Sequence, residues 1–347
     1  MRVPIYLTVW SEKTTGHGED AYPILEVRGG AGLLAVFDGM GGSGAATYLD
    51  TEGQPRTGAY LGSRLACEVV KNFWARNSFS QEEAISFVDR LKDDLTNSIQ
   101  ATVNRYQAPK SQLKSSLVRR LPTTLAAIIY NSQENATATG DYYYVLSTWA
   151  GDSRCYMLTP DAGLQQLSND DLMESVDAFA NLTADFPLSN CVNADQPVSL
   201  NRSSRITAGP LLLITATDGC FHYVPTPMHF EYLVLKSLLE ASDEGQWREN
   251  LSQKISEITG DDASMALIGL GWSQFTALRE AFQERLETME GQYINPLDEA
   301  REKATRSRAE LEAAERRSHN LQLSLWAEYK RSYEKCAPKG EKTFRRQ

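Results

Sequence analysis

The sequence predicts an α+β fold. Short, strand-like apolar runs open the chain, two adjacent amphipathic helices follow them, and further strands return afterwards. This order departs from the regular alternation of strand and helix that a doubly wound parallel sheet requires. Periodicity alone goes no further than this class. The 347 residues allow about two domains, and 41% hydrophobic residues are enough for one large core.

Strands and two helices are expected in the first half of the chain. Residues 3–10, 24–28 and 31–37 are short apolar or alternating runs, which is typical of strands. Residues 59–75 repeat apolar side chains every four positions, and residues 85–103 carry one apolar stripe, so both are predicted helices. Three further strands are expected at residues 125–130, 142–150 and 154–158.

The second half of the sequence is less regular. Residues 168–205 are mixed and polar, and we expect an irregular insert there with a short helix at residues 170–179. Strands are predicted at residues 211–217 and 263–270, with helices at residues 228–241 and 246–258 between them. Gly260 is placed to end the second of these helices.

A change of composition at Ser273 divides the chain into an expected globular domain at residues 1–272 and a helical part at residues 273–347. Apolar residues recur in the helical part at spacings of three and four, among many Arg and Glu residues. This pattern predicts a helical hairpin or coiled-coil-like appendage with a break at residues 291–296 and a basic tail. Its stripe must be buried against the body, a second copy or a partner. We therefore expect the appendage to mediate oligomer or partner contact and to be dispensable for chemistry.

Charge and cysteine content argue against several classes of function. The net charge is −10, and residues 273–347 carry 15 Lys or Arg against 13 Asp or Glu, so the acidic excess lies in residues 1–272. An acidic body disfavours nucleic-acid binding, which requires Lys and Arg to neutralise phosphates. The five cysteines are odd in number and widely spaced, which favours a reducing, cytoplasmic location. No apolar run approaches the ~18 residues of a membrane span.

Acidic residues stand repeatedly at the ends of expected strands. Asp38-Gly39 follows the run at residues 31–37, and Asp218-Gly219 follows the run at residues 211–217. A strand fixes the carboxylate and a glycine lets the backbone approach a ligand closely, which suits a hard divalent cation. A single Asp-Gly pair also marks an ordinary turn. Further acidic segments occur at Gly151-Asp152, Asp261-Asp262 and Glu19-Asp20.

The ordered set of these motifs resembles the metal-dependent serine/threonine protein phosphatases of type 2C, in their bacterial form. One D-G-x-G-G motif is weak support, whereas the order of the whole set is specific. The resemblance covers about residues 1–271. The matching segments are Glu19-Asp20, Asp38-Gly39-Met40-Gly41-Gly42, Pro122-Thr123-Thr124-Leu125-Ala126, Gly151-Asp152-Ser153-Arg154, Leu167-Ser168-Asn169-Asp170, Thr217-Asp218-Gly219 and Asp261-Asp262-Ala263.

This resemblance implies both a fold and a function. The implied fold is a central sandwich of two mainly antiparallel β-sheets flanked by helices, with metals at one end. The implied activity is the hydrolysis of phosphoserine and phosphothreonine in proteins by a water that two manganese or magnesium ions activate, with room for a third, weaker metal. Such an enzyme acts on phosphoprotein substrates alongside a Ser/Thr kinase system.

The resemblance also implies roles for individual residues. Asp38 is the expected bridge between the two metals, and Asp38 and Asp218 are the expected catalytic residues. Asp152 is expected at the third metal site, although a β-turn organised by Asp152 and Arg154 explains the same motif. The implied metal ligands are Glu19, Asp20, Asp38, the carbonyl of Gly39, Asp152, Asp218 and Asp261.

Two positions depart from the family pattern. Met40 stands where eukaryotic relatives have a histidine that is regarded as the general acid, and methionine cannot donate a proton. Thr15 stands where the family often has a phosphate-binding arginine. Lys13, Arg2 or Arg28 could reach the phosphate instead, and the sequence does not choose between them.

Three further residues are weaker candidates. Ser189 and Asn190 belong to a predicted flap at residues 185–195 and could contact a phosphopeptide, although a loop of this composition needs no function. His222 follows Asp218 by four residues and could replace the missing general acid, but packing beside its aromatic neighbours is the simpler explanation.

Two functions therefore compete. The first is a metal-dependent protein phosphatase, which the acidic motifs favour. The second is a catalytically weak, phosphatase-like binding or scaffold module that acts through its helical tail, which Thr15 and the appendage favour. Manganese-dependent turnover of a small aryl phosphate distinguishes them.

Overall fold

The structure is a computed structural model that describes residues 4–50, 52–105, 119–133, 141–174, 176–182, 184 and 186–336. The chain divides into two units, Met1–Glu290 and Gly291–Gln347. All described strands belong to the first unit, and the described part of the second unit is helical.

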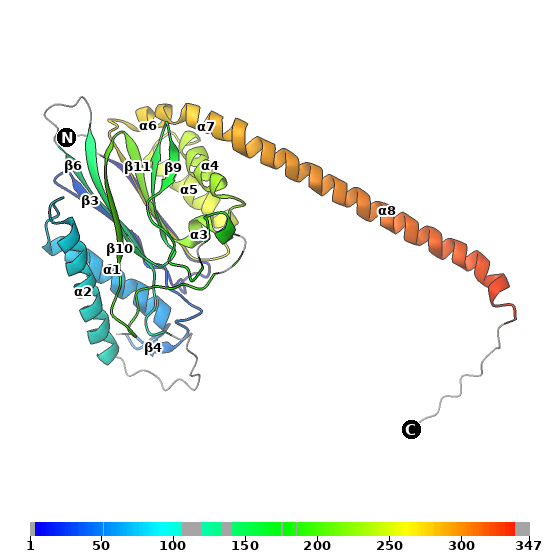
Figure 1. The fold of residues 1–347 in the computed structure, drawn as a ribbon, viewed down its shortest axis with the longest axis horizontal. Coiled ribbons are helices and arrows are strands. Elements are labelled where there is room, and N and C mark those ends of the chain that lie inside the picture. The colour runs from blue at the N-terminus through cyan, green and yellow to red at the C-terminus, as the bar shows by residue number, and fades with distance from the viewer. Residues whose placement is uncertain are drawn as a thin grey trace, which may run out of the picture. The chain divides into compact units, whose positions relative to one another are not determined.

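Two five-stranded antiparallel sheets form the centre of the first unit (Figure 1). One sheet has the order β1-β12-β11-β8-β9, which is Ile5–Ser11, Ala263–Leu270, Leu211–Ala216, Arg154–Thr159 and Gly163–Gln166. The other has the order β10-β7-β6-β3-β2, which is Asn201–Ala208, Tyr142–Ala150, Leu125–Gln133, Ala31–Val36 and Ile24–Arg28. A separate pair joins β4 (Thr47–Leu49) to β5 (Pro55–Thr57). These sheets confirm the sandwich that the resemblance implied.

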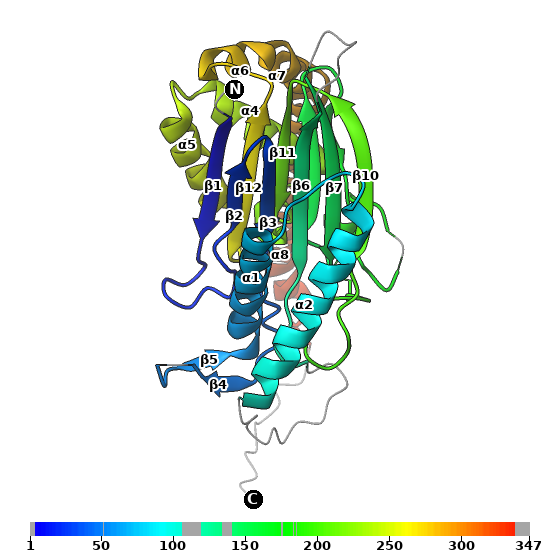
Figure 2. The ribbon, with the colours of Figure 1, turned by 90° about the vertical axis from the view of Figure 1, so that its left-hand side faces the viewer.

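Helices cover the outer face of each sheet. Figure 2 shows α1 (Gly58–Arg76) and α2 (Ala84–Arg105) beside the sheet that contains β3, β6 and β7, and one buried cluster joins these elements. On the other sheet, α4 (Pro227–Leu239) and α5 (Glu244–Ile258) pack over β1, β11 and β12. A short helix, α3 (Asp218–Phe221), begins directly after β11.

Strand β3 shows why the sequence forms a sandwich with both faces covered. Leu34 and Val36 belong to the cluster between the sheets, whereas Leu33 and Ala35 belong to the cluster beneath α1 and α2. Successive side chains of a strand point to opposite faces, so a strand buried on both sides must be apolar throughout. The run at residues 31–37 meets this requirement and carries Asp38 to the end of the sheet.

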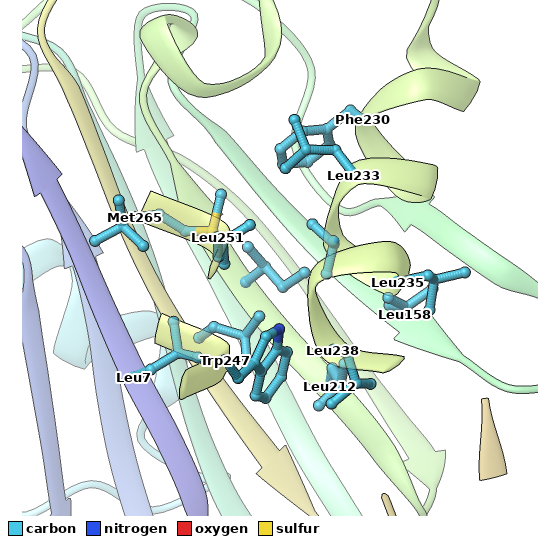
Figure 3. Packing of buried hydrophobic residues seen from close by; sticks show 14 of the residues in the cluster. Leu7, Leu158, Leu212, Phe230, Leu233, Leu235, Leu238, Trp247, Leu251 and Met265 are labelled. Atoms are coloured by element: carbon cyan, nitrogen blue, oxygen red, sulfur yellow. The ribbon is translucent and has the colours of Figure 1, made fainter. Parts of the chain in front are cut away.

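The outer cluster of the other sheet centres on Trp247 and Leu251 of α5 (Figure 3). Both side chains are fully buried, and the indole Nε1 of Trp247 donates to Ser237 Oγ at 3.2 Å. The close-up shows residues of β1, β8, β11, β12 and α4 around them: Leu7, Leu158, Leu212, Met265, Phe230, Leu233, Leu235 and Leu238.

The insert at residues 168–205 differs from expectation in two ways. The helix predicted at residues 170–179 is wrong: the described residues there form turns and an isolated bridge, and the nearest helix is a 3-10 turn at Ala180–Leu182. Residues 201–208 form β10, an edge strand paired with β7. Most of its side chains are exposed, so it lacks the apolar alternation on which strand prediction depends.

The first unit extends beyond the boundary expected at residue 272. Helices α6 (Phe275–Ala281) and α7 (Gln283–Met289) pack into its core, where Leu278 and Phe282 are fully buried. Arg285 of α7 also forms a two-pronged ion pair with Glu231 of α4, at 2.6 and 3.0 Å. The apolar stripe predicted for this segment is therefore buried against the body.

The described part of the second unit, residues 291–336, does not contain the predicted hairpin. The expected break at residues 291–296 lies in a π-helical turn, Glu290–Ile294, which leads directly into α8 (Asn295–Tyr333). Pro296 lies in the first turn of α8, where a missing backbone N–H leaves no helical hydrogen bond unmade. No residue of α8 is buried. Among the described residues, no helix is long and apolar enough to cross a membrane.

Candidate metal centre

Four aspartates from distant parts of the sequence meet at one end of the sandwich; we call Asp20, Asp38, Asp152 and Asp218 the carboxyl cluster. Asp38 follows β3, Asp218 follows β11, Asp152 lies in the turn between β7 and β8, and Asp20 precedes β2. The charges of the other three members all raise the pKa of Asp38. The structure thus brings together four of the predicted ligands.

The carboxyl cluster is electrostatically unfavourable without a cation. Burial is the largest cause of raised pKa values in all four groups, bringing Asp20 and Asp218 to about 7 and Asp152 to about 8, and holding Asp38 well above its usual range. A hydrogen bond between the carboxyl groups of Asp38 and Asp20 lowers the pKa of Asp20 and raises that of Asp38. Burial and like charge together favour either bound protons or a bound cation.

Two neighbouring strands hold the side chain of Asp20. Its Oδ2 accepts from Ser264 Oγ of β12 at 2.8 Å and from Thr217 Oγ1 at the end of β11 at 2.9 Å. Asp20 is only 1% exposed. Two hydroxyl donors favour its ionised form, although not enough to offset burial. The carboxylate is therefore positioned before any ligand arrives.

The Pro-Thr-Thr motif holds the backbone of Asp38. The Asp38 carbonyl accepts from Thr124 N at 2.8 Å and from Thr123 Oγ1 at 2.7 Å, and Asp38 N donates to Thr124 Oγ1 at 3.2 Å. Thr124 Oγ1 also shares a hydrogen bond of 2.6 Å with Ser153 Oγ. This network links the end of β3 to the turn that carries Asp152.

The glycines of the D-G-M-G-G motif make room for Glu19. A Cβ atom on Gly39 would lie 2.5 Å from the Glu19 carbonyl oxygen, and one on Gly41 would overlap the Glu19 carboxylate. Glu19 Oε1 accepts from Thr57 Oγ1 at 2.5 Å, while burial raises the Glu19 pKa. Glycine is required at position 39, because there the loop approaches the backbone of the acidic segment so closely.

The acidic doublet before β12 has two separate roles. Asp261 is exposed, and its charge raises the pKa values of Asp218 and Glu19. Asp262 instead accepts backbone N–H groups, from Lys13 at 2.7 Å and from Glu19 at 2.5 Å. Sequence reasoning missed this role of Asp262, for which the doublet itself was the only signal.

The acids after β9 stabilise the loops around the Asp152 turn. Arg154 and Asp170 form a buried ion pair, with Nε–Oδ1 and Nη2–Oδ2 distances of 2.8 and 2.6 Å, and the guanidinium stacks 4.3 Å from the centre of the Phe221 ring. Asp171 accepts from Gly151 N at 3.1 Å and from the side-chain amides of Asn190 and Asn201. Arg154 therefore organises the loops around this turn, and it does so through Asp170.

The predicted phosphate contacts are spread over the surface. Lys13 and Ser189 are exposed, whereas the Asn190 amide is directed at Asp171 and the Ser199 carbonyl. Arg28 donates to the carbonyls of Trp74 and Ala75 and stacks 4.8 Å from the centre of the Trp74 ring, so it is engaged with α1. Arg2 lies outside the described residues.

The sequence candidates for a general acid differ in position. Met40 is half-buried in the loop after Asp38. The backbone N–H of His222 donates to the Asp218 carbonyl at 2.7 Å, and its ring lies 5.9 Å from that of Tyr223, centre to centre. This placement agrees with the aromatic packing expected for His222.

The donor chemistry of the carboxyl cluster fits divalent metals. All its side-chain donors are oxygens, which magnesium and manganese prefer. As they stand, no three acidic, histidine or cysteine side chains of the described residues are arranged to hold an ion. Holding an ion there would therefore require the carboxylates to move closer together.

Comparisons with known proteins agree with this geometry. The model of the protein phosphatase 2C family matches residues 13–257. The fold is similar to that of the Mycobacterium tuberculosis phosphatase PstP/Ppp, with 16% identity over 78% of this chain and 100% of that chain and a TM-score of 0.53. For Stp1 from Staphylococcus aureus, the identity is 16% over 77% and 95%, with a TM-score of 0.54. A search of the curated proteins found no match.

The match over residues 13–257 covers most of the chain. The chain therefore belongs to the protein phosphatase 2C family, and it is of the class of protein serine/threonine phosphatases. A structure of the PstP catalytic domain in complex with two manganese ions is also similar, at 15% identity over 78% of this chain and 98% of that chain and a TM-score of 0.51. At such identities the solved structures show the fold alone.

Proposed function

We propose that this chain hydrolyses phosphoserine and phosphothreonine in proteins, using two manganese or magnesium ions to activate a water molecule. One observation carries the proposal: the carboxyl cluster brings together four acids, one buried and three half-buried, whose pKa values are raised by desolvation and by one another's charge. A bound cation would relieve this repulsion. The two manganese ions in the similar PstP structure support manganese as the metal.

We assign the ligands as the family resemblance implies, to the acids in and around the carboxyl cluster. Asp38 is central in the carboxyl cluster and suits the bridging position, with the Gly39 carbonyl beside it. Asp218 and Asp261 suit one ion, and Glu19 with Asp20 the shell of the other. Asp152 suits a third, weaker site, and the charge of Asp218 raises its pKa. When bound, the ions supply an activated water and neutralise charge on the phosphoryl oxygens.

The chain's own residues position these groups for that chemistry. Ser264 and Thr217 fix one oxygen of Asp20, and Thr123 and Thr124 fix the backbone of Asp38. Such preorganisation lowers the cost of arranging charged groups during the reaction. Since Met40 cannot donate a proton, we assign protonation of the leaving oxygen to solvent rather than to this side chain.

Substrate and context complete the proposal. Exposed Lys13 and Ser189 remain candidates for contact with a phosphoprotein. The side-chain amide of Asn190 donates to Asp171 instead. We place the chain in a Ser/Thr kinase system and in the cytoplasm, since all five cysteines are free thiols.

The test is turnover of p-nitrophenyl phosphate and then of a phosphothreonine peptide, with manganese, magnesium or a chelator. We expect hydrolysis only with metal, and its loss in Asp218→Asn but not in Asp161→Asn, an exposed acid in the turn between β8 and β9. Full activity of Asp218→Asn contradicts the proposed metal site. Manganese binding without turnover of either substrate favours the weak binding module instead.

A further inference from the structure

Helix α8 presents an apolar stripe that nothing within its own helix covers. Leu311, Leu321 and Leu325 are 59%, 59% and 56% exposed, and none of the residues of α8 is buried. Side chains three and four positions apart lie on one face of a helix, and these leucines share such a face. We propose that α8 pairs with α8 of a second copy of this chain as an antiparallel two-stranded coiled coil.

The stripe follows a heptad pattern over residues 297–325 of α8. In the usual notation, the first core position (a) falls at residues 297, 304, 311, 318 and 325, and the second (d) at residues 300, 307, 314 and 321. Every residue at these positions is leucine, alanine or serine. Small residues at five of these nine core positions allow two helices to approach closely, provided that each leucine meets a small residue.

One antiparallel register satisfies this condition in each inner layer. When Leu311 lies opposite Ala314 of the second copy, the other core layers follow from the heptad spacing. Each leucine of these layers then meets an alanine, and serine meets serine. The layers are Leu311 with Ala314, Ala304 with Leu321, Ala300 with Leu325, and Ser307 with Ser318. The outermost layer sets Leu297 against Glu328, where the helix pair ends.

The flanking charges select the same register independently. In an antiparallel pair, the positions beside the core that face each other are e with e and g with g. Here Arg308 faces Glu315 of the second copy, and Glu310 faces Arg317. Twofold symmetry produces each contact twice, so four pairs of opposite charge flank the centre of the helix.

Competing arrangements place like charges together. A parallel, in-register pair sets Lys303 against Arg308 and Glu310 against Glu315. Sliding the antiparallel pair by one heptad sets Glu310 against Glu310 in one direction and Glu315 against Glu315 in the other. The charges thus disfavour these alternatives, as sequences that specify one pairing do.

The length of α8 fits the same register. The symmetry axis of the pair falls between residues 312 and 313, close to the middle of Asn295–Tyr333. The two helices therefore overlap over almost their whole length, about five heptads or roughly 55 Å at 1.5 Å per residue.

The first test uses the full chain in sedimentation equilibrium over a range of concentrations. We expect a dimer of twice 38.7 kDa. Arg308→Glu turns two attractive pairs into repulsive ones and should raise the dimer dissociation constant roughly tenfold or more. Arg316→Glu is the matched control, since Arg308 and Arg316 both lie four residues from Glu312 but only Arg308 flanks the core. This control should change the constant by less than about threefold.

Mixing variants tests the pairing of specific residues. Glu315→Arg alone should weaken the dimer as Arg308→Glu does, and a mixture of the two variants should recover a heterodimer, because each contact is attractive again. A parallel pair predicts the reverse for Arg308→Glu alone, which would then face Lys303 and tighten. A monomeric wild-type chain at 100 µM, or equal effects of Arg308→Glu and Arg316→Glu, also overturns the proposal.

Disulfide formation tests orientation directly in a Cys336→Ser background. Ala300→Cys and Leu325→Cys face each other only in the proposed register. We expect a disulfide-linked dimer when the two variants are mixed under oxidising conditions and little from either alone, since identical positions lie about 37 Å apart along the helix. Cross-linking of Ala300→Cys with itself contradicts the antiparallel arrangement.

Discussion

The carboxyl cluster and helix α8 use charge in opposite ways. In the cluster, four acids of like charge lie together, one buried and three half-buried, and two hydroxyl donors hold Asp20 in place despite the repulsion. Along α8, acids and bases alternate on a helix with no buried residue. Buried charges of one sign create a site that needs a ligand. Exposed charges of both signs contribute little to the stability of a single chain. They stabilise a complex when a second surface places opposite charges beside them.

The largest effect should come from cutting the chain inside the region that packs into the body. Ending the chain after Trp272 removes four side chains of the core, Leu278, Phe282, Leu286 and Met289, together with the buried Ile294. Each contributes about 1.5–3 kcal/mol, so a loss of roughly 6 kcal/mol or more exhausts the stability of a typical domain. We expect no cooperative thermal transition for this truncation. A chain ending at Asn295, which keeps the buried Ile294, should melt like the full chain, and equal melting of both truncations contradicts this account.

A smaller effect separates buried from exposed ion pairs. Arg154→Ala leaves Asp170 buried without its cation and should cost about 3–5 kcal/mol in urea unfolding. Arg202→Ala breaks an exposed pair with Asp89 and should cost less than about 1 kcal/mol. Similar costs for the two variants would mean that burial of the pair does not determine its contribution.

Asp38→Asn tests the claim that the like charges of the carboxyl cluster serve function and destabilise the metal-free fold; we call this the stored-repulsion account. Turnover of p-nitrophenyl phosphate should fall by more than about a hundredfold. Changing a residue that only supports a metal ligand typically costs less than this. The metal-free fold should be as stable as wild type at pH 8 or more so, because one buried charge has been removed. Asp161→Asn should match wild type in both measurements. Loss of folding in Asp38→Asn contradicts the stored-repulsion account.

The pH dependence of the metal-free chain follows from the sign of the pKa shifts. Asp20 and Asp218 have folded pKa values of about 7 and Asp152 of about 8, above the ~3.9 of an unfolded aspartate. The folded state therefore retains protons that the unfolded state releases, and stability falls as pH rises from about 4 through 8. We expect a loss of at least about 1 kcal/mol between pH 5 and 8 in urea unfolding, and its suppression by manganese.

Sequence reasoning predicted the parts of the fold that depend on local pattern. The apolar run that ends at Asp38 and the run that ends at Asp218 both form strands, and the structure brings the two acids together. Strand β10 was missed because, as an exposed edge, it carries polar side chains. The long, exposed α8 was read as a hairpin because Gly291 and Pro296 resemble a break, whereas a π-helical turn accommodates both.

Contacts between distant residues were the hardest part of the site to predict. Asp170 and Asp171 resemble the acidic start of a helix, yet Arg154 engages the first and two asparagine amides the second. No periodicity marks such pairings, which form only when the loops fold together. Asp262 escaped prediction for the same reason, because its partners are backbone N–H groups far away in sequence.

Calorimetric titration of the metal-free protein with manganese tests the central claim most directly. The carboxyl cluster should bind two ions per wild-type chain, with the same result for Asp161→Asn. Asp38→Asn should lose at least one of the two sites, because the proposed bridging carboxylate is gone. If Asp38→Asn binds manganese with the stoichiometry and affinity of wild type, the carboxyl cluster is not the metal centre.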